Sequence, residues 1–250
     1  MKTYLISASA FLLASAGAAF AQEQAPTATT EAAAAAAPSA EAPAAPAGPE
    51  TMTYAPKDAA ADGCELHIWP AERMTSMTTG LLGGGLLDAA LHSNRDATNR
   101  TLLASALDSP SQLDALLSLD LRTMIKMTPG TTIVTHAKPL ERKTMNSVKT
   151  RRSDSQATCY SELIVADVFY QKAAIYGRSL RTLFMVREFG KDQKIDFEYK
   201  AWGGNGLKLF PPKEGDDALA ALDELVGVFK KNFEEYANNE AKAPRKPVKS

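Results

Sequence analysis

Only part of this chain has enough large apolar side chains to build a core. From Gln22 to about Asp62 the sequence is dominated by alanine, proline, threonine and glutamate, including an unbroken alanine run over 32–37. Such a stretch cannot bury enough apolar surface to offset the entropy lost on ordering, and its prolines interrupt any long helix. We therefore predict a disordered arm over residues 22–62, followed by the folded part of the chain.

The first 21 residues have the organisation of a secretory signal peptide. A basic start is followed by an apolar stretch from Tyr4 to about Ala16, and residues 19–21 read Ala-Phe-Ala, the pattern that a signal peptidase cuts. The apolar stretch is shorter than the roughly 20 residues that a membrane span needs. We expect a periplasmic or secreted protein with no transmembrane span after cleavage. If the signal is kept, it serves as an anchor instead.

Residues 63–239 have the length of one domain, long enough to bury about 70% of the surface that the unfolded chain exposes. The basic segment 240–250 that follows is predicted to be a disordered tail. The net charge of −1 is too balanced to favour a polyanionic partner, so we do not expect nucleic-acid binding.

The apolar pattern predicts a sheet and several helices. Strands are expected over 64–69, 131–136, 158–170, 178–189 and 194–202. Helices are expected over 88–108 with a break near 93–94, from Ser109 to about Thr128, and over 216–236. This order predicts an α+β fold, with a mixed, largely antiparallel sheet of about five strands and helices packed mainly on one face.

Cys64 and Cys159 are the only cysteines. In an exported chain an even pair indicates a disulfide, and strand alternation places both residues on the apolar face of their strands. We predict a Cys64–Cys159 disulfide. Two separate buried thiols are the alternative.

The same cysteines raise the question of a metal, because His67, His92 and His136 would complete a set of zinc ligands. Alternation along the first strand, however, puts His67 on the face opposite Cys64, and there is no second closely spaced ligand pair. We therefore predict no metal and no cofactor.

Asp88, His92 and Asp96 are four residues apart, which aligns them on one face of a helix. A histidine oriented by a carboxylate is a general-base arrangement. A solvated helix face is the competing interpretation, and the chain has no Gly-x-Ser-x-Gly, Ser-x-x-Lys or His-Glu-x-x-His motif. The sequence thus favours a protein that is not an enzyme, with this trio as its catalytic candidates.

A long basic connection joins two predicted strands. Its cations are Lys138, Arg142, Lys143, Lys149, Arg151 and Arg152. A polar connection of this length is unusual in a compact domain and indicates function or disorder. These residues are the candidate binding site for an anionic envelope component. A solvated loop is the favoured interpretation.

The segment Gly80–Leu87 is rich in glycine and leucine. It is no phosphate-binding P-loop, because no Gly-Lys-Ser/Thr follows. It is either an apolar loop that contacts a partner or a membrane, or a segment buried in the domain. Burial is favoured, since an exposed run of leucines would be sticky.

The start C-E-L-H-I-W-P, together with C-Y-S-E-L, Y-G and G-L-K-L-F-P-P before an amphipathic helix, resembles uncharacterised exported proteins of Gram-negative bacteria. The order of elements over about 64–236 resembles the small α/β modules of curli-secretion CsgG-type envelope assembly lipoproteins. This second resemblance is one of fold and transfers no functional residues. The chain lacks the lipid-modified cysteine of those lipoproteins.

Taken together, these features favour an exported, non-catalytic envelope accessory or binding protein, whose partner is an envelope protein or an anionic envelope component. One alternative is a hydrolase of envelope polymers that uses His92 with a carboxylate. The other is a structural secreted protein.

Overall fold

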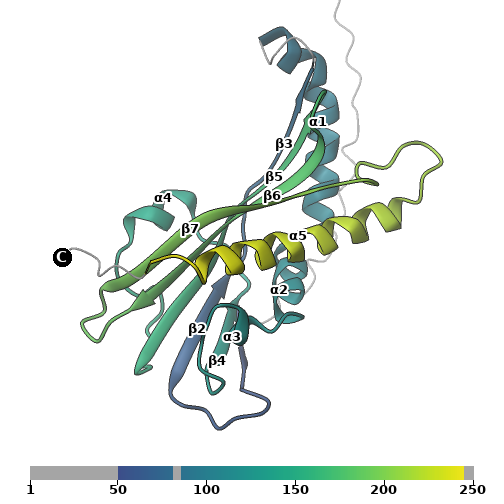
Figure 1. Cartoon of the computed structure of the whole chain (residues 1–250). Coiled ribbons are helices and arrows are strands. Elements are labelled where there is room, and N and C mark those ends of the chain that lie inside the picture. The colour runs from purple at the N-terminus through teal and green to yellow at the C-terminus, as the bar shows by residue number, and fades with distance from the viewer. Residues whose placement is uncertain (1–49, 81–85, 245–250) are drawn as a thin grey trace, which may run out of the picture. The chain divides into compact units, whose positions relative to one another are not determined.

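The computed structural model describes residues 50–80 and 86–244, which form one mixed sheet with helices on both faces (Figure 1). The elements are β1 (Thr51–Tyr54), β2 (Cys64–Trp69), β3 (Met74–Thr79), α1 (Leu86–Ala106), α2 (Ser109–Leu117), α3 (Leu121–Met124), β4 (Thr132–His136), α4 (Arg142–Ser147), β5 (Cys159–Ala173), β6 (Gly177–Phe189), β7 (Ile195–Gly206) and α5 (Ala218–Glu240). The expected signal peptide, most of the expected arm, the centre of the glycine-rich segment and residues 245–250 lie outside the described residues. Within the described ranges, no helix is both long enough and apolar enough to cross a bilayer.

The sheet has the strand order β1-β4-β2-β5-β6-β7, and β3 also pairs with β5. The first part of β5 runs parallel to β2, its second part runs parallel to β3, and β6 pairs antiparallel with both parts. The longest ladders, β5–β6 and β6–β7, are antiparallel. The structure therefore confirms the mixed, largely antiparallel sheet, with seven strands instead of about five.

The main core lies between the sheet and the helices α1, α2, α3 and α5. Helix α5 crosses β6 and β7 and buries an aromatic stripe that includes Phe229, Phe233 and Tyr236. A smaller cluster of buried apolar residues, which includes Trp69 and Met145 of α4, covers the other face of the sheet. The prediction that the helices pack mainly on one face is confirmed.

The domain begins before residue 63, so the prediction of disorder is wrong for residues 50–62. Strand β1 pairs antiparallel with β4, although its side chains are mostly exposed. Backbone pairing rather than burial holds this strand, and composition does not reveal such pairing. Asp62 then fixes the entry into β2, because its carboxylate accepts hydrogen bonds from the amide of Cys64 (2.9 Å) and the hydroxyl of Thr128.

Two helix predictions are also wrong. Helix α1 continues through residues 93–94, where a break was expected, and Asp96 ties it to the strand β3 that the sequence did not reveal. The Asp96 carboxylate accepts hydrogen bonds from the Ser76 hydroxyl (3.1 Å) and from the Thr78 amide (3.0 Å) and hydroxyl (2.7 Å). The single helix expected after Ser109 is split into α2 and α3, because Asp120 caps a new helix start.

Helix α5 approaches strand β7 most closely at Gly203. A methyl group at this position would lie 2.8 Å from the Cα of Asn232 and would overlap that residue's carbonyl group. Asn232 is itself fully buried, and its side-chain amide donates to the carbonyl of Leu180 at 2.9 Å. The contact between helix and sheet therefore requires glycine at position 203.

We predict that Gly203→Ala lowers the free energy of unfolding by about 1–3 kcal/mol, because the helix must move away from the sheet. Gly204→Ala is the matched control, since a methyl group there meets only the flexible side chain of Arg181, at 3.3 Å. Urea denaturation of both variants measures the difference. Equal losses in the two variants would show that α5 does not pack this tightly.

Candidate functional site

The structure divides the predicted basic connection, residues 137–158, into two sets of cations. Arg151 and Arg152 are half-buried against the sheet, whereas the side chains of Lys138, Arg142, Lys143 and Lys149 are exposed. The Arg151 guanidinium lies over the ring of Tyr160, 5.0 Å from its centroid, and donates to the carbonyl of Ala157 at 3.0 Å. Arg151 thus fixes the loop to the sheet, and only the exposed set is open to a partner.

Arg152 joins a buried chain of charges. Its Nε lies 3.4 Å from Oε2 of Glu162, a fully buried residue of β5, and its backbone amide donates to the other carboxylate oxygen at 3.0 Å. Glu162 lies opposite the fully buried Arg187 in the β5–β6 ladder, and Arg187 pairs in turn with Glu198 at 2.7 Å. Burial raises the pKa of Glu162, and the charge of Arg152 lowers it only in part. These groups neutralise one another, which is the behaviour of a structural network.

Next to this network lies a histidine cluster, made of Glu65, His67, Trp69, His136 and Tyr160. His67 is 4% exposed, and its two ring nitrogens lie 2.9 Å from Glu65 Oε2 and 2.9 Å from His136 Nε2. The ring of His136 stacks flat on Trp69, with centroids 4.1 Å apart. The prediction that His67 lies on the sheet face opposite Cys64 is confirmed, since Cys64 shares its face with Leu66 and Ile68 of the main core.

The cluster resembles a proton relay in its connectivity, but its groups are already occupied. Burial lowers the pKa of His67, and it lowers the pKa of His136 from 6.5 to about 4. Both rings are therefore neutral near pH 7 and hydrogen-bond to each other, while Glu65 also accepts a hydrogen bond from the hydroxyl of Ser155. Over residues 50–80 and 92–244, whose side chains the structure describes, no three side chains of His, Cys, Asp or Glu are grouped to hold a metal ion.

The buried state of His136 predicts a loss of stability in acid. The unfolded state binds more protons than the folded state between about pH 6.5 and pH 4, so stability falls as the pH drops through this range. His136→Phe keeps an aromatic ring against Trp69 but cannot be protonated. We expect it to flatten the pH dependence of the unfolding free energy by on the order of 1–2 kcal/mol.

Urea denaturation at several pH values tests this expectation. Glu162 works in the opposite direction, because its pKa is raised, but it is present in both proteins and its effect cancels. An unchanged slope in His136→Phe would contradict the burial of a neutral imidazole.

The three predicted catalytic candidates share one helix, but one of them is already engaged by a neighbouring strand. Asp88, His92 and Asp96 all lie in α1, but both oxygens of Asp96 are occupied by hydrogen bonds from β3. His92 is half-buried, and the side chain of Asp88 lies outside the described residues. Asp96 therefore has a structural role.

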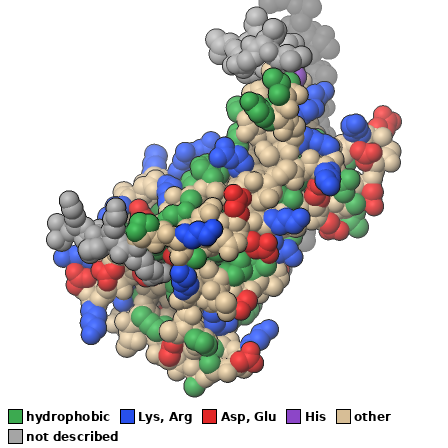
Figure 2. All heavy atoms as spheres, viewed as in Figure 1, with side chains coloured by type: hydrophobic (Ala, Val, Ile, Leu, Met, Phe, Trp, Pro, Cys, Tyr) green, Lys and Arg blue, Asp and Glu red, His purple; other side chains and the backbone are tan. Residues whose placement is uncertain are grey.

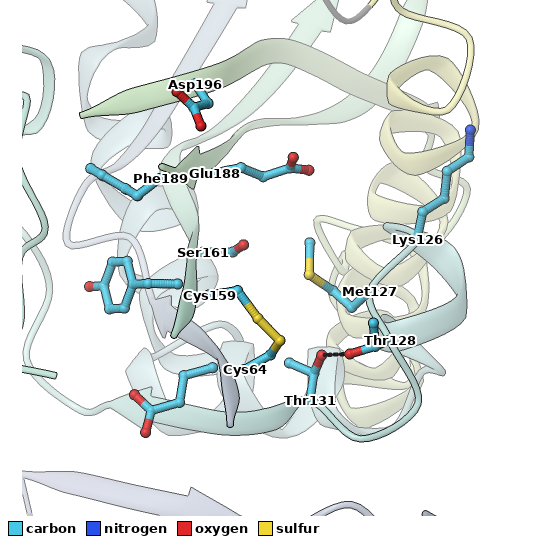
Figure 3. Close-up of a pocket in the computed structure, with 12 residues that line it drawn as sticks. Cys64, Lys126, Met127, Thr128, Thr131, Cys159, Ser161, Glu188, Phe189 and Asp196 are labelled. Carbon is cyan, nitrogen blue, oxygen red and sulfur yellow. Dashed lines mark hydrogen bonds between the residues drawn. A yellow bond between two sulfur atoms is a disulfide. The ribbon is translucent and has the colours of Figure 1, made fainter. Parts of the chain in front are cut away.

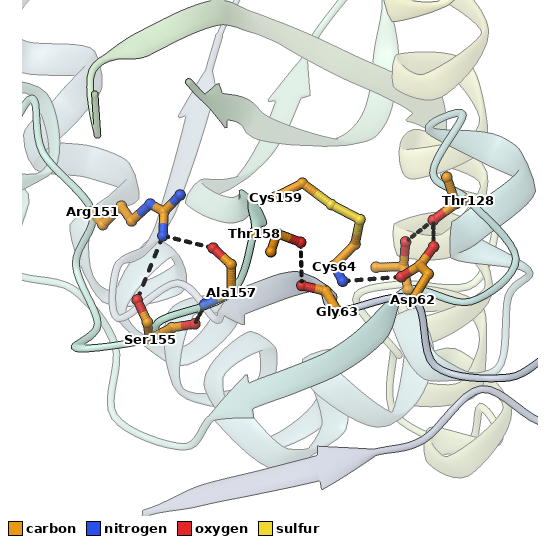
Figure 4. The surroundings of a disulfide bond; sticks show 10 residues. Asp62, Gly63, Cys64, Thr128, Arg151, Ser155, Ala157, Thr158 and Cys159 are labelled. Carbon is orange, nitrogen blue, oxygen red and sulfur yellow. Dashed lines mark hydrogen bonds between the residues drawn. A yellow bond between two sulfur atoms is a disulfide. The ribbon is translucent and has the colours of Figure 1, made fainter. Parts of the chain in front are cut away.

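The predicted disulfide is present (Figure 4). Cys64 and Cys159 are direct partners in the parallel β2–β5 ladder, with Cα atoms 4.6 Å apart, and they join positions separated by 95 residues. Beside them, the amide and the hydroxyl of Thr158 both donate to the carbonyl of Gly63, at 3.1 and 3.2 Å. The bond thus fixes the register at which two distant parts of the chain begin to pair.

We predict that replacing both cysteines by alanine lowers the free energy of unfolding by about 2–4.5 kcal/mol, since a long loop is no longer closed in the unfolded chain. Denaturation in the presence and absence of a reductant measures the effect. The wild type should respond to the reductant and the double variant should not. A wild type insensitive to reduction, with the thiols shown to be free, would contradict the prediction.

A small cavity lies against the disulfide (Figure 3). Its volume is about 260 Å³, and its charged lining residues are Glu65, Glu188, Asp196 and Lys126. Lys126 already donates to the carbonyl of Ala241 at 2.8 Å. The cavity is smaller than the roughly 300–1,000 Å³ that is usual for ligand pockets, so we do not regard it as the functional site.

A larger cavity lies between α1, the end of the β5–β6 hairpin and the turn at Pro211–Pro212. Its volume is about 800 Å³, and we call it the basic cavity. Four cationic side chains line it, and no Asp or Glu is among its lining residues: Arg95, Lys172, Arg178 and Lys213. Figure 2 shows Lys and Arg side chains around the part of the molecule where Figure 1 places α1 and this end of the hairpin.

Two of these cations are placed unfavourably for the protein alone. Lys172 and Arg178 are direct partners in the antiparallel β5–β6 ladder. Like charges that face each other across a ladder destabilise a sheet. An anion between them would remove this cost.

The carboxylates around the basic cavity hold backbone groups in place, although Asp216 and Asp217 also line a smaller neighbouring cavity of about 290 Å³ together with Arg178 and Lys213. Asp96 binds β3, and Asp216 and Asp217 accept hydrogen bonds from the amides of Lys213 and Ala220 in the turn before α5. Burial alone would raise the pKa of Glu224, but hydrogen bonds from three successive amides and the charge of Arg178 lower it. The described residues include no ion-pair partner within 4 Å for the four cavity cations. Arg178 is partly engaged, because its guanidinium donates to the carbonyl of Lys208 and its charge helps to lower the pKa of Glu224.

One buried donor lines the basic cavity, and a second lies within electrostatic range of its Arg95 and Arg178. Asn99 lines the basic cavity, is only 3% exposed, and its side-chain nitrogen has no hydrogen-bond partner in the described part of the chain. The hydroxyl of the fully buried Tyr170 also lacks a partner there, and burial raises its pKa to about 12, so that it keeps its proton. A buried donor without a partner is costly unless a ligand or water accepts from it. Cations and free donors together make this cavity suited to an anion.

The sequence did not reveal the basic cavity, because its cations come from four separate places in the chain. Arg95 is in α1, Lys172 and Arg178 are on two strands, and Lys213 follows the proline turn. Each of them is an ordinary surface charge in the sequence. A hairpin between residues 158–170 and 178–189 could be predicted from the sequence. That Lys172 lies opposite Arg178 follows only from the register in which β5 and β6 pair.

Comparisons with known proteins add little. No protein-family model matches the chain, and no curated protein matches it. The structure is similar to the hypothetical protein CT253 of Chlamydia trachomatis, with 10% identity, a TM-score of 0.31, and coverage of 71% of this chain and 96% of the other. It is also similar to an uncharacterised protein, with 13% identity, a TM-score of 0.24, and coverage of 76% and 95%. Both TM-scores are too low to support an argument, and the CsgG-type resemblance stays a prediction.

Proposed function

We propose that this chain is an exported, non-catalytic binding protein that takes an anionic ligand in the basic cavity. The observation that carries the proposal is the lining of the cavity: four cations, two of them facing each other across a ladder, and no carboxylate. An anion that contacts Lys172 and Arg178 together replaces repulsion by two charge-assisted hydrogen bonds.

The compartment supports this choice of ligand. The amino-terminal pattern of an export signal and the disulfide both fit a periplasmic or secreted protein. The bacterial envelope is rich in phosphate and carboxylate groups, which are the anions that arginine and lysine bind. The four exposed cations of the basic connection form a second basic surface for an anionic envelope component or protein.

The state of the titratable groups supports a role without catalysis. The histidines of the histidine cluster are neutral and hydrogen-bonded to each other, and Asp96 is held by β3. The basic cavity itself offers cations and donors but neither a histidine nor a carboxylate. Such a lining holds an anion without a group that could take its proton.

The double variant Arg95→Gln/Lys172→Gln tests the proposal. We expect it to weaken binding of inorganic phosphate or citrate about 10- to 100-fold, because two charge-assisted contacts are lost. Isothermal titration calorimetry at low ionic strength measures the affinity. Without any anion, Lys172→Gln should raise the melting temperature, since it removes the repulsion from Arg178.

Lys231→Gln/Lys242→Gln is the matched control, because it changes the net charge by the same amount on exposed residues that lie neither in the basic cavity nor in the basic connection. The proposal fails if this control weakens binding as strongly as the cavity variant does. It also fails if the wild type binds neither anion.

A further inference from the structure

The tip of the β5–β6 hairpin, residues 174–176, exposes two large apolar side chains. Ile175 is 79% exposed and Tyr176 is 90% exposed, more than any other large apolar side chain of the described residues. Gly177 follows with a φ of 75°, a conformation that favours glycine and lets the chain turn back into β6. Holding these two side chains in water is unfavourable, because neither is covered by the domain.

A single exposed apolar residue needs no explanation, but this tip lies directly beside the basic cavity. Ala173 and Ala174 on one side of the tip and Gly177 and Arg178 on the other all line that cavity. The exposed apolar side chains of the hairpin tip therefore lie next to the cations of the basic cavity.

This combination matches the chemistry of an anionic membrane surface. Such a surface has negative phosphate groups outside and hydrocarbon beneath, and it attracts basic residues near an inserting apolar segment. Tyrosine suits the boundary because its ring is apolar and its hydroxyl is polar. A protein partner with an apolar pocket would bury Ile175 and Tyr176 equally well, but it would not explain the adjoining cations.

We propose that the hairpin tip docks this protein on a membrane that contains anionic phospholipid. Ile175 and Tyr176 enter the interface, and the basic cavity, directly behind the tip, receives the phosphate of a lipid headgroup. This inference rests on the proposed function, because the cations that bind the headgroup are those of the basic cavity. It adds that the anion is part of a lipid.

Flotation with vesicles tests the docking. The protein is purified in the form that cells release, so that the wild type and every variant have the same amino terminus. It is mixed with vesicles of phosphatidylglycerol and phosphatidylcholine, or of phosphatidylcholine alone. We expect binding to the mixed vesicles only, and a loss of at least about tenfold in Ile175→Ser/Tyr176→Ser, since two apolar side chains no longer enter the bilayer.

Two controls make the result specific. Met52→Ser removes another exposed apolar side chain, 49% exposed in the edge strand β1 and absent from the cavity lining, and should float like the wild type. Tyr176→Trp should shift its fluorescence to the blue with mixed vesicles, because its ring leaves water. Circular dichroism checks that the serine double variant folds. If the double variant does not fold, the fluorescence of Tyr176→Trp still tests whether the tip enters the membrane.

The outcomes separate the two proposals. If the tip variant binds soluble glycerol phosphate like the wild type but no longer floats, the docking is supported. If the tip variant floats like the wild type, or Tyr176→Trp shows no shift, the docking is overturned. If the wild type binds glycerol phosphate but does not float, the docking fails and the proposed function stands. If it binds neither, both fail.

Discussion

The pairing of β5 on both of its edges is the constraint on which the rest of this molecule depends. β5 binds β2 and then β3 on one edge and β6 along the other, so each part of the domain is placed relative to it. A bulge between Val165 and Asp167 changes which side chains face the main core. Leu163 and Val165 face that core before the bulge, and Val168 and Tyr170 face it afterwards. A strand of this length could not otherwise keep one continuous core while it bends.

The two halves of β5 therefore differ in how well their charges and apolar side chains are compensated. The half before the bulge is stabilised by two contacts. The disulfide joins its start to β2, and buried arginines neutralise Glu162. The half after the bulge carries Lys172 near its end, opposite Arg178, with two exposed apolar residues at the turn beyond. Stability is thus concentrated at one end of the strand, and the uncompensated features lie at the other end.

Local patterns in the sequence were enough to predict the elements that bury a regular face. The strand at 64–69, the disulfide and the aromatic stripe of α5 all follow from alternation or helical spacing, and the structure confirms them. β1 and β3 were missed because their residues give no clear alternation and pair mainly through the backbone. The candidate site was missed for a related reason. Arg95, Lys172 and Arg178 come together only once the bulge and the register of β5 are known.

The position of the basic cavity also explains why the domain tolerates its repulsion. Like charges and unpaired buried donors lower stability, and they persist only where the surrounding structure holds them in place. Here α1 is fixed to β3 by Asp96, and the turn before α5 is fixed by Glu224, so both walls of the cavity are held by carboxylates that bind backbone amides. The acidic residues that could have neutralised the cations instead shape the walls. The anion that we propose as the ligand would therefore bind to a preformed cavity, and its binding would restore the stability that the charges cost.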